Sequence, residues 1–331
     1  MAGEQLPRAY CRRRLRLAGR HVRYAAIDCG TNAIRLLIAE VDGDTVHDIE
    51  RRMETVRLGE GVDATGELSD AAIARTLTVV DQYATAIRDH TVHQVRMVAT
   101  SAVRDAQNSS EFVRGVHERL GVQPEVLTGQ QEAELAFRGA LGGLAATTIT
   151  PPILVTDIGG GSTEIVLSDH TGTAVASWCS VNIGCVRMTE RHLRSDPPTM
   201  EEVEAARADI DQVLADVDQR MPLHTARTLV GLAGSVTTVA AIALGLDHYD
   251  ATRIHGSTTT YSEVTRVTDT LMGMSRQQRA AEPVMHPGRV DVIAGGSLVL
   301  QRLMTQARAS AVIASETDVL DGIVRQLSSG L

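Results

Sequence analysis

Apolar residues along the chain form short runs and helical stretches in a repeated order, which predicts a mixed α/β structure. In the first half, the predicted strands are 24–28, 33–41, 45–57, 93–99 and 123–127, and the predicted helices are about 69–90, 109–120 and a helix from about 129. In the second half, the predicted strands are 153–157, 163–168, 173–180, 227–231 and 310–314, and the predicted helices are about 200–219, a helix from 234, a helical stretch within 261–306 and a last helix over 317–328. Each half therefore has the order βββαβαβα, with the added helical stretch before the last strand.

Polar residues mark the expected starts of three helices in the first half. Ser69 is placed to cap the first, and Asn108, followed by Glu111, is placed to cap the second. Thr128 and Gln131 have the spacing of a capping box at the third.

The duplicated order predicts an α/β protein of two ribonuclease-H-like lobes, with the active site in the cleft between them. We expect residues 1–22 to form a disordered tail, 23–128 the first lobe and 129–314 the second lobe. The C-terminal helix, about 315–331, is placed to pack back on the first lobe.

Two glycine-containing hairpin turns stand at matching places in the two halves. The segment 157–164, DIGGGSTE, follows an apolar strand, and the segment 28–35, DCGTNAIR, aligns with it without a gap. Glycines let backbone N–H groups approach an anion closely, hydroxyls add donors, and carboxylates beside a phosphate commonly hold a divalent cation. An ordinary hairpin turn is the alternative for either segment alone. If the halves face each other, both turns can hold one phosphate chain and its metal.

Composition narrows the chemistry further. The 331 residues carry a net charge of -9, which argues against general nucleic-acid binding, and all 32 basic residues are arginines. The absence of lysine excludes a P-loop lysine and a Schiff-base lysine. The cysteines, at 11, 29, 179 and 185, have no zinc-site spacing, which favours a reduced, cytoplasmic setting. The arginine-rich stretch near residue 12 precedes no apolar segment, so we expect neither a signal peptide nor a membrane span.

Several ordered motifs resemble those of the exopolyphosphatase and guanosine pentaphosphate phosphohydrolase (Ppx/GppA) family, in its short two-domain form, within the actin, Hsp70 and sugar-kinase superfamily. The motifs are DCGTN at 28–32, ATSAVRDA at 99–106, TGQQEA at 128–133, DIGGGSTE at 157–164, NIGCVR at 182–187 and PGRVDVI at 287–293. The resemblance runs from about residue 24 to the C-terminus. It implies hydrolysis of a terminal phosphoanhydride bond, with Mg²⁺ in the interlobe cleft.

The position that matches the family's catalytic glutamate is Glu132, which the resemblance implies as the base that activates water. The family commonly has two adjacent acids at this point, whereas this chain has Gln131 before Glu132. Any tuning of the catalytic glutamate by an acidic neighbour is therefore in doubt. Without the resemblance, the favoured interpretation of Glu132 is an ordinary solvated acid in the first turn of a helix.

The other candidate residues divide into metal ligands and phosphate contacts. The metal candidates are Asp157, Glu164 and Asp28, binding Mg²⁺, or Mn²⁺ as an alternative, directly or through water. Pairing with an arginine is the alternative for Glu164. The phosphate-binding candidates are Gly30, Thr31, Asn32, Arg104, Gly160, Gly161, Ser162, Thr163 and Ser235, the last at a strand-to-helix corner over 231–238.

The sequence therefore predicts a Mg²⁺-dependent hydrolase of inorganic polyphosphate that prefers short chains. Removal of the γ-phosphate of guanosine pentaphosphate, a role in the stringent response, and a non-hydrolysing sensor of polyphosphate or guanosine penta- or tetraphosphate remain alternatives, as does a kinase-like ATPase of the same superfamily. We expect a cytoplasmic homodimer with no nucleic-acid or membrane partner.

Overall fold

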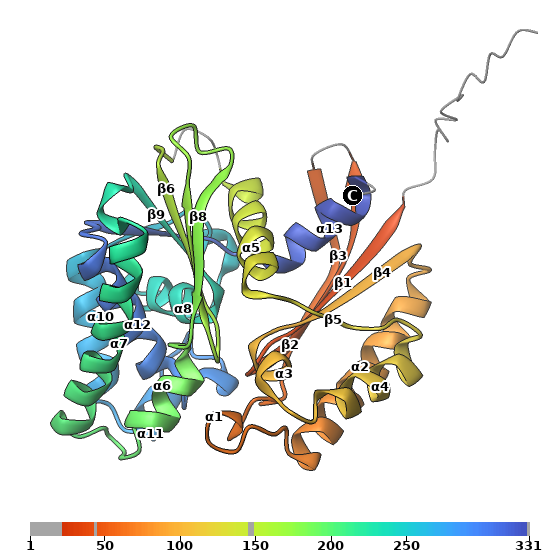
Figure 1. The fold of residues 1–331 in the computed structure, drawn as a ribbon, viewed down its shortest axis with the longest axis horizontal. Helices are drawn as coiled ribbons and strands as arrows, with labels where there is room; N and C mark the ends of the chain where they lie inside the picture. The colour runs from red at the N-terminus through yellow and green to blue at the C-terminus, as the bar shows by residue number, and fades with distance from the viewer. Residues whose placement is uncertain (1–21, 43–44, 145–148, 330–331) are drawn as a thin grey trace, which may run out of the picture.

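The chain folds into two α/β lobes that lie side by side, which confirms the predicted fold class (Figure 1). The computed structural model describes residues 22–42, 45–144 and 149–329. The tail predicted for 1–22 lies outside the described residues except for its last position. No helix among the described residues is long and apolar enough to cross a bilayer.

The first lobe is built on a five-stranded sheet in the order β3-β2-β1-β4-β5. Its strands are β1 (Arg23–Cys29), β2 (Ala33–Asp42), β3 (Thr45–Thr55), β4 (Gln94–Ala99) and β5 (Glu125–Val126). The strands β1, β2 and β3 pair antiparallel, whereas β4 and β5 extend the sheet in parallel. The lobe's helices are α1 (Val62–Thr65), α2 (Asp70–Asp89), α3 (Ser101–Asp105) and α4 (Ser109–Leu120).

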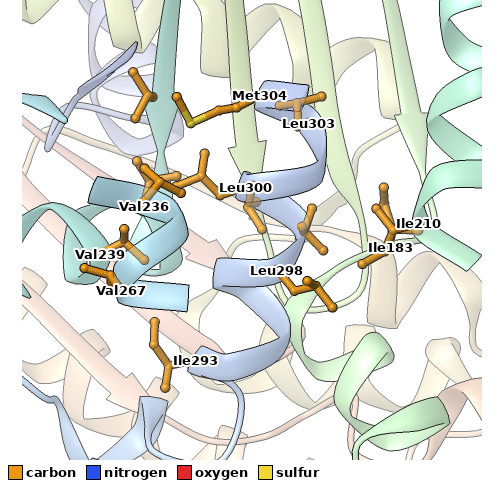
Figure 2. Close-up of a cluster of buried hydrophobic side chains, with 14 of the residues drawn as sticks. Ile183, Ile210, Val236, Val239, Val267, Ile293, Leu298, Leu300, Leu303 and Met304 are labelled. Atoms are coloured by element: carbon orange, nitrogen blue, oxygen red, sulfur yellow. The ribbon is translucent and has the colours of Figure 1, made fainter. Parts of the chain in front are cut away.

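The second lobe has a six-stranded sheet in the order β10-β11-β9-β6-β7-β8. Its strands are β6 (Ile153–Ile158), β7 (Thr163–Ser168), β8 (Val175–Val181), β9 (Thr228–Leu232), β10 (Thr258–Thr260) and β11 (Ala311–Ala314). Its helices on the outer side are α6 (Cys185–His192), α7 (Met200–Arg220), α8 (Ala233–Ala243), α9 (Ala251–Ile254), α10 (Tyr261–Gly273), α11 (Arg276–Ala280) and α12 (Ile293–Gln306), with 3₁₀ turns at Leu223–Thr225 and Pro287–Arg289. The side chains of α12 fill much of the core between these helices and the sheet (Figure 2).

Two helices, α5 (Gly129–Gly143) and α13 (Val319–Ser329), form a layer between the sheets (Figure 1). Successive side chains along a strand point to opposite faces of the sheet. Ile27 therefore packs toward α2 and α4, whereas its neighbour Ala26 packs toward this central layer. The helices cross at glycines, because a Cβ on Gly139 would lie 1.8 Å from the carbonyl oxygen of Asp318 and one on Gly322 would lie 2.5 Å from that of Leu135. The two helices of the central layer therefore cross in close contact.

Ion pairs join the lobes where α1 meets α6. Arg187 of α6 pairs with Asp63 of α1 and, at 2.7 Å, with Asp105 at the end of α3. Arg191, one turn further along α6, also pairs with Asp63 at 2.6 Å. On the same side, Arg57 donates to Asp291 at 2.5 Å. These contacts link the loop after β3 to the second lobe.

The predicted starts of three helices were confirmed, although one of them lacks the side-chain cap. Ser69 accepts a hydrogen bond from the backbone of Ala72, and Thr128 and Gln131 form the predicted capping box. Asn108 holds the N-cap position of α4, as predicted, but its side-chain amide bonds the backbone of Leu68 and not the first turn of the helix. The short helices α1, α3 and α6 and the strand β10 were not predicted, since each is too brief for a clear periodicity.

Candidate functional site

The two glycine-containing turns meet face to face between the lobes. A Cβ on Gly160 would lie 2.9 Å from Cβ of Thr31, and one on Gly161 would lie 2.8 Å from its Oγ1. Thr31 also shares a hydrogen bond of 2.9 Å with Ser101 at the start of α3. Asn32 donates from its side-chain amide to the carbonyl of Gly288, 3.1 Å away in the second lobe. Glycine is required in the second turn because the first approaches it so closely.

A cavity opens beside these turns, with about 900 Å³ of space free of protein atoms, part of it open to solvent. The candidates that line it are Asp28, Gly30, Thr31, Asn32, Glu132, Asp157, Gly160, Ser162 and Ser235. The other residues around it are Ala33, Arg35, Met53, Thr55, Thr100, Ser101, Ile158, Gly159, Cys185, Ala233, Gly234, His286, Arg289, Val292, Ile293 and Val319. Both lobes and both central helices therefore contribute to one cavity.

Glu132 enters this cavity from the first turn of α5 and is 7% exposed. Its Oε2 accepts a hydrogen bond of 3.0 Å from Arg104, which also donates to the carbonyl of Leu127 at 3.0 Å. Burial raises the pKa of Glu132 well above its usual range, the charge of Glu164 raises it further, and Arg104 opposes both. A carboxyl with a raised pKa, beside an arginine and in a cavity, has the setting of a general base.

Asp157 and Glu164 are direct cross-strand partners on β6 and β7. Burial, and after it the charge of Glu164, raises the pKa of Asp157 to about 8. Burial also raises the pKa of Glu164, although hydroxyl hydrogen bonds from Ser180 at 2.7 Å and Ser162 at 2.9 Å oppose that shift. The pair is thus a buried acidic site that a proton or a cation would stabilise.

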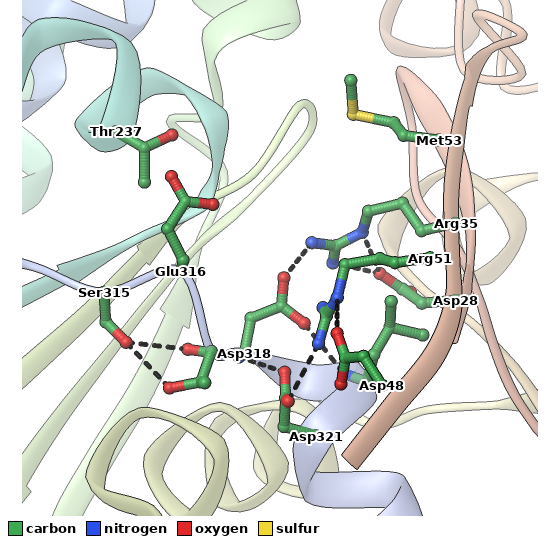
Figure 3. A network of polar contacts seen from close by, with 12 residues as sticks. Asp28, Arg35, Asp48, Arg51, Met53, Thr237, Ser315, Glu316, Asp318 and Asp321 are labelled. Atoms are coloured by element: carbon green, nitrogen blue, oxygen red, sulfur yellow. Dashed lines mark hydrogen bonds and ion pairs between the residues drawn. The ribbon is translucent and has the colours of Figure 1, made fainter. Parts of the chain in front are cut away.

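Asp28 occupies the matching place in the first lobe, where its cross-strand partner is Arg35. Arg35 donates to Oδ2 of Asp28 through both Nε, at 3.2 Å, and Nη2 (Figure 3). The second carboxylate oxygen, Oδ1, is buried and has no hydrogen-bond partner in the part of the chain described. Burial raises the pKa of Asp28 and Arg35 lowers it.

No three His, Cys, Asp or Glu side chains of the described residues lie together as a metal centre made of protein ligands alone. Asp28 and Asp157 line the cavity, but Glu164 does not, because it is 1% exposed and lies behind Ser162. This arrangement suits a cation such as Mg²⁺, which takes one or two carboxylates and fills its remaining positions with water and phosphate oxygens.

Three of the expected phosphate contacts lie outside the cavity wall. Arg104 pairs with Glu132, so its guanidinium faces the candidate base. Thr163 is fully buried, and its hydroxyl donates to the carbonyl of Ile183 at 3.0 Å. Gly161 accepts at its carbonyl from Arg187 at 2.8 Å and supports the turn.

The strand-to-helix corner at Ser235 has the predicted form, since β9 ends at Leu232 and α8 begins at Ala233. Ala233 has a φ of 65°, a left-handed conformation that is strained for a residue with a Cβ. Ala233 and Ser235 both line the cavity, so the backbone N–H groups at the start of α8 lie at the cavity wall.

Sequence reasoning missed several arginine and hydroxyl groups of the cavity. Arg35 stands in the first turn motif, and its place opposite Asp28 follows from pairing across a tight hairpin. Arg289 stands in the motif 287–293; it donates to Thr238 at 2.9 Å and lies over the ring of Tyr249 at 5.5 Å. Ser101 stands in the motif 99–106. The motifs marked all three regions, but only the fold shows which side chains face the cavity.

Comparison with known proteins places the chain in a family. A profile of the Ppx/GppA phosphatase family matches residues 37–329. Exopolyphosphatase 2 of Mycobacterium tuberculosis is 48% identical over 319 residues, which are 92% of this chain and 98% of that protein. The crystal structure of an exopolyphosphatase-like protein has a TM-score of 0.89 at 40% identity and covers 93% of this chain and 99% of that one. The Aquifex aeolicus member of the Ppx/GppA family has a TM-score of 0.79 at 30% identity, over 93% of this chain and 98% of its own. The chain belongs to the Ppx/GppA phosphatase family.

Proposed function

We propose that the protein is an exopolyphosphatase, which hydrolyses the terminal phosphoanhydride bond of inorganic polyphosphate and releases orthophosphate. The observation that carries this proposal is the placement of Glu132, with its raised pKa, in the cavity wall beside the paired turns of the two lobes. The names of its relatives support the same activity.

The reaction would proceed by attack of water on the terminal phosphorus atom. Glu132 takes a proton from that water, a phosphorus–oxygen bond forms, and the bond to the bridging oxygen breaks, so the shortened polyphosphate leaves. Oε1 of Glu132 is the oxygen suited to this role, since Oε2 accepts from Arg104. The N–H groups of the two turns and the hydroxyl of Thr31 would orient the terminal phosphoryl group.

We further propose that the site works with Mg²⁺, or with Mn²⁺ as an alternative. Asp28, whose Oδ1 has no hydrogen-bond partner among the described residues, and Asp157 would hold the cation, with Glu164 acting through water or through Ser162. When bound, such a cation neutralises charge on the phosphate oxygens. The buried acidic residues fit this group because a cation would offset the unfavourable burial of their charge.

The cavity wall favours polyphosphate over a guanosine nucleotide. None of the described residues that line it is Phe, Tyr or Trp, so the wall offers no aromatic surface on which a base would stack. The nearby ring of Tyr249 is covered by Arg289. We propose a preference for short chains, a cytoplasmic location and a homodimer, as the sequence predicts. Guanosine penta- and tetraphosphate stay as alternative ligands.

Phosphate release by purified protein tests the proposal. Short polyphosphate, long polyphosphate, guanosine pentaphosphate and ATP are compared at equal concentrations of phosphoryl termini, each with Mg²⁺ and with a chelator. We expect release from short polyphosphate that is several-fold faster than from the other substrates and that stops with the chelator. Release mainly from guanosine pentaphosphate would assign the other activity, and binding without release would indicate a sensor.

A further inference from the structure

A buried ionic network connects the cavity to the helix between the lobes. Arg35 lies between two carboxylates: it donates to Asp28 on β1 and, through Nη1, to Oδ2 of Asp318, 283 positions away in sequence (Figure 3). Asp318 directly precedes α13 and is 7% exposed. Arg35 is thus the link between a cavity residue of the first lobe and a central helix.

Arg35 occupies only one oxygen of Asp28. Its Nε and Nη2 both reach Oδ2, which leaves Oδ1 buried and without a partner among the described residues. A guanidinium free to move would engage both oxygens of a carboxylate in a fork, the geometry that such pairs favour. The third nitrogen, Nη1, is held by Asp318, so Arg35 keeps its offset position.

Asp318 is itself fixed by the start of α13. Its Oδ1 accepts from the backbone N–H of Leu320 at 2.9 Å, and its own N–H donates to Asp321 at 2.9 Å. Asp321 in turn accepts from Arg51 at 3.0 Å. Because both oxygens of Asp318 are engaged, its carboxylate has one defined orientation toward Arg35.

We propose that Arg35 is a positioning residue, held by Asp318, that keeps Oδ1 of Asp28 available to the site's divalent cation. This inference rests on the proposed metal-dependent function. The two aspartates neutralise the guanidinium between them, so it repels the cation less than an unpaired arginine would. Loss of Asp318 would remove one negative charge near the cation and free Arg35 to cover Oδ1.

The test measures cation binding without substrate, using Mn²⁺ alone as the probe, because its free-ion paramagnetic resonance signal falls on binding. Asp318→Asn keeps an oxygen for Leu320 but cannot accept from Arg35, and Arg35→Lys keeps the charge but cannot bridge both aspartates. We expect each variant to raise the Kd for Mn²⁺ about tenfold. The double variant should also raise the Kd for Mn²⁺ about tenfold, because both changes break the same link between Arg35 and Asp318.

Arg52→Gln is the matched control, because it also removes an arginine that is paired with an acid on β3, but Arg52 pairs with Glu50 and does not line the cavity. Its Kd for Mn²⁺ should stay within about twofold of the unaltered protein. An unchanged Kd in Asp318→Asn would overturn the proposal, as would a loss of about a hundredfold in the double variant, which would mean independent effects. No Mn²⁺ binding to the unaltered protein would also overturn it, while phosphate release by the same preparation reports separately on the proposed function.

Discussion

Asp157 lies directly opposite Glu164 in the antiparallel pairing of β6 and β7. The matching hairpin of the first lobe pairs Asp28 with Arg35. The two hairpins therefore differ in charge, since an arginine neutralises the acid of one and a second acid faces the acid of the other. The second lobe thus supplies the excess negative charge of the cavity, which a proton or a metal ion would offset.

Replacing Asp157 by asparagine should stabilise the metal-free protein at alkaline pH while it abolishes most activity. The folded-state pKa of about 8 lies above the ordinary value of about 3.9, so the folded state binds the proton more tightly than the unfolded state. The carboxylate therefore reduces stability as pH rises from about 4 to about 8. The gain in Tm for Asp157→Asn should grow over this window and then level off, as scanning calorimetry with a chelator would show.

Two comparisons check this explanation. Asp81→Asn, at an exposed position paired with Arg119, should change Tm little at any of these pH values. Mg²⁺ should raise the Tm of the unaltered protein and have less effect on Asp157→Asn. A Tm gain that is the same at pH 4 and pH 8 would rule out charge burial as its cause.

Replacing Arg104 by glutamine should move the acid limb of the pH–rate profile to higher pH. Glu132 must be ionised to accept a proton, and Arg104 is the charge that lowers its raised pKa. For the unaltered protein, kcat/KM for short polyphosphate should fall with decreasing pH at a pH well above the ordinary pKa of a glutamate. In Arg104→Gln the same fall should occur at a still higher pH. Arg96→Gln, which removes an arginine paired with Glu125 away from the cavity, should leave the limb in place. An unshifted acid limb in Arg104→Gln would mean that Arg104 does not lower the pKa of the catalytic base.

An alanine at Gly139 should destabilise the protein through the helix crossing. Its Cβ would lie 1.8 Å from the carbonyl oxygen of Asp318, so α5 and α13 would have to separate. We expect a loss of about 1–3 kcal/mol, the range for overpacking, measured by urea unfolding. Gly273→Ala is the control, because the added Cβ would meet no described residue beyond its own stretch of helix within 4 Å. A less flexible unfolded chain makes that change neutral or favourable. Equal stability of the two variants would mean that the crossing tolerates expansion.

The strands of the hairpins and the start of α5 could be predicted, because they depend on residues that are close together in the sequence. Apolar runs predicted the strands of both hairpins, and the spacing of Thr128 and Gln131 predicted the first turn of α5, which carries Glu132. The glycines of the turn at 157–164 were visible in the sequence itself. The structure adds the reason for two of them, because a Cβ on Gly160 or Gly161 would collide with Thr31.

The remaining contacts of the site join residues far apart in sequence, which periodicity does not report. The pairing of Arg35 with Asp318 spans 283 positions, and that of Arg104 with Glu132 depends on how α3 and α5 are placed relative to each other. Arg104 was expected at a phosphate, but in the structure its charge faces the candidate base.

The measurement that tests the account most directly is orthophosphate release from short polyphosphate by Glu132→Gln, beside the unaltered protein and Glu134→Gln. Glu134 lies on the same helix but does not line the cavity, so its variant controls for a lost carboxylate on α5. We expect Glu132→Gln to bind polyphosphate, to unfold at a Tm no lower than that of the unaltered protein, and to lose about 10²–10⁴-fold in kcat. Glu134→Gln should retain near-normal turnover. Near-normal release by Glu132→Gln would contradict its role as the base and, with it, the proposed mechanism.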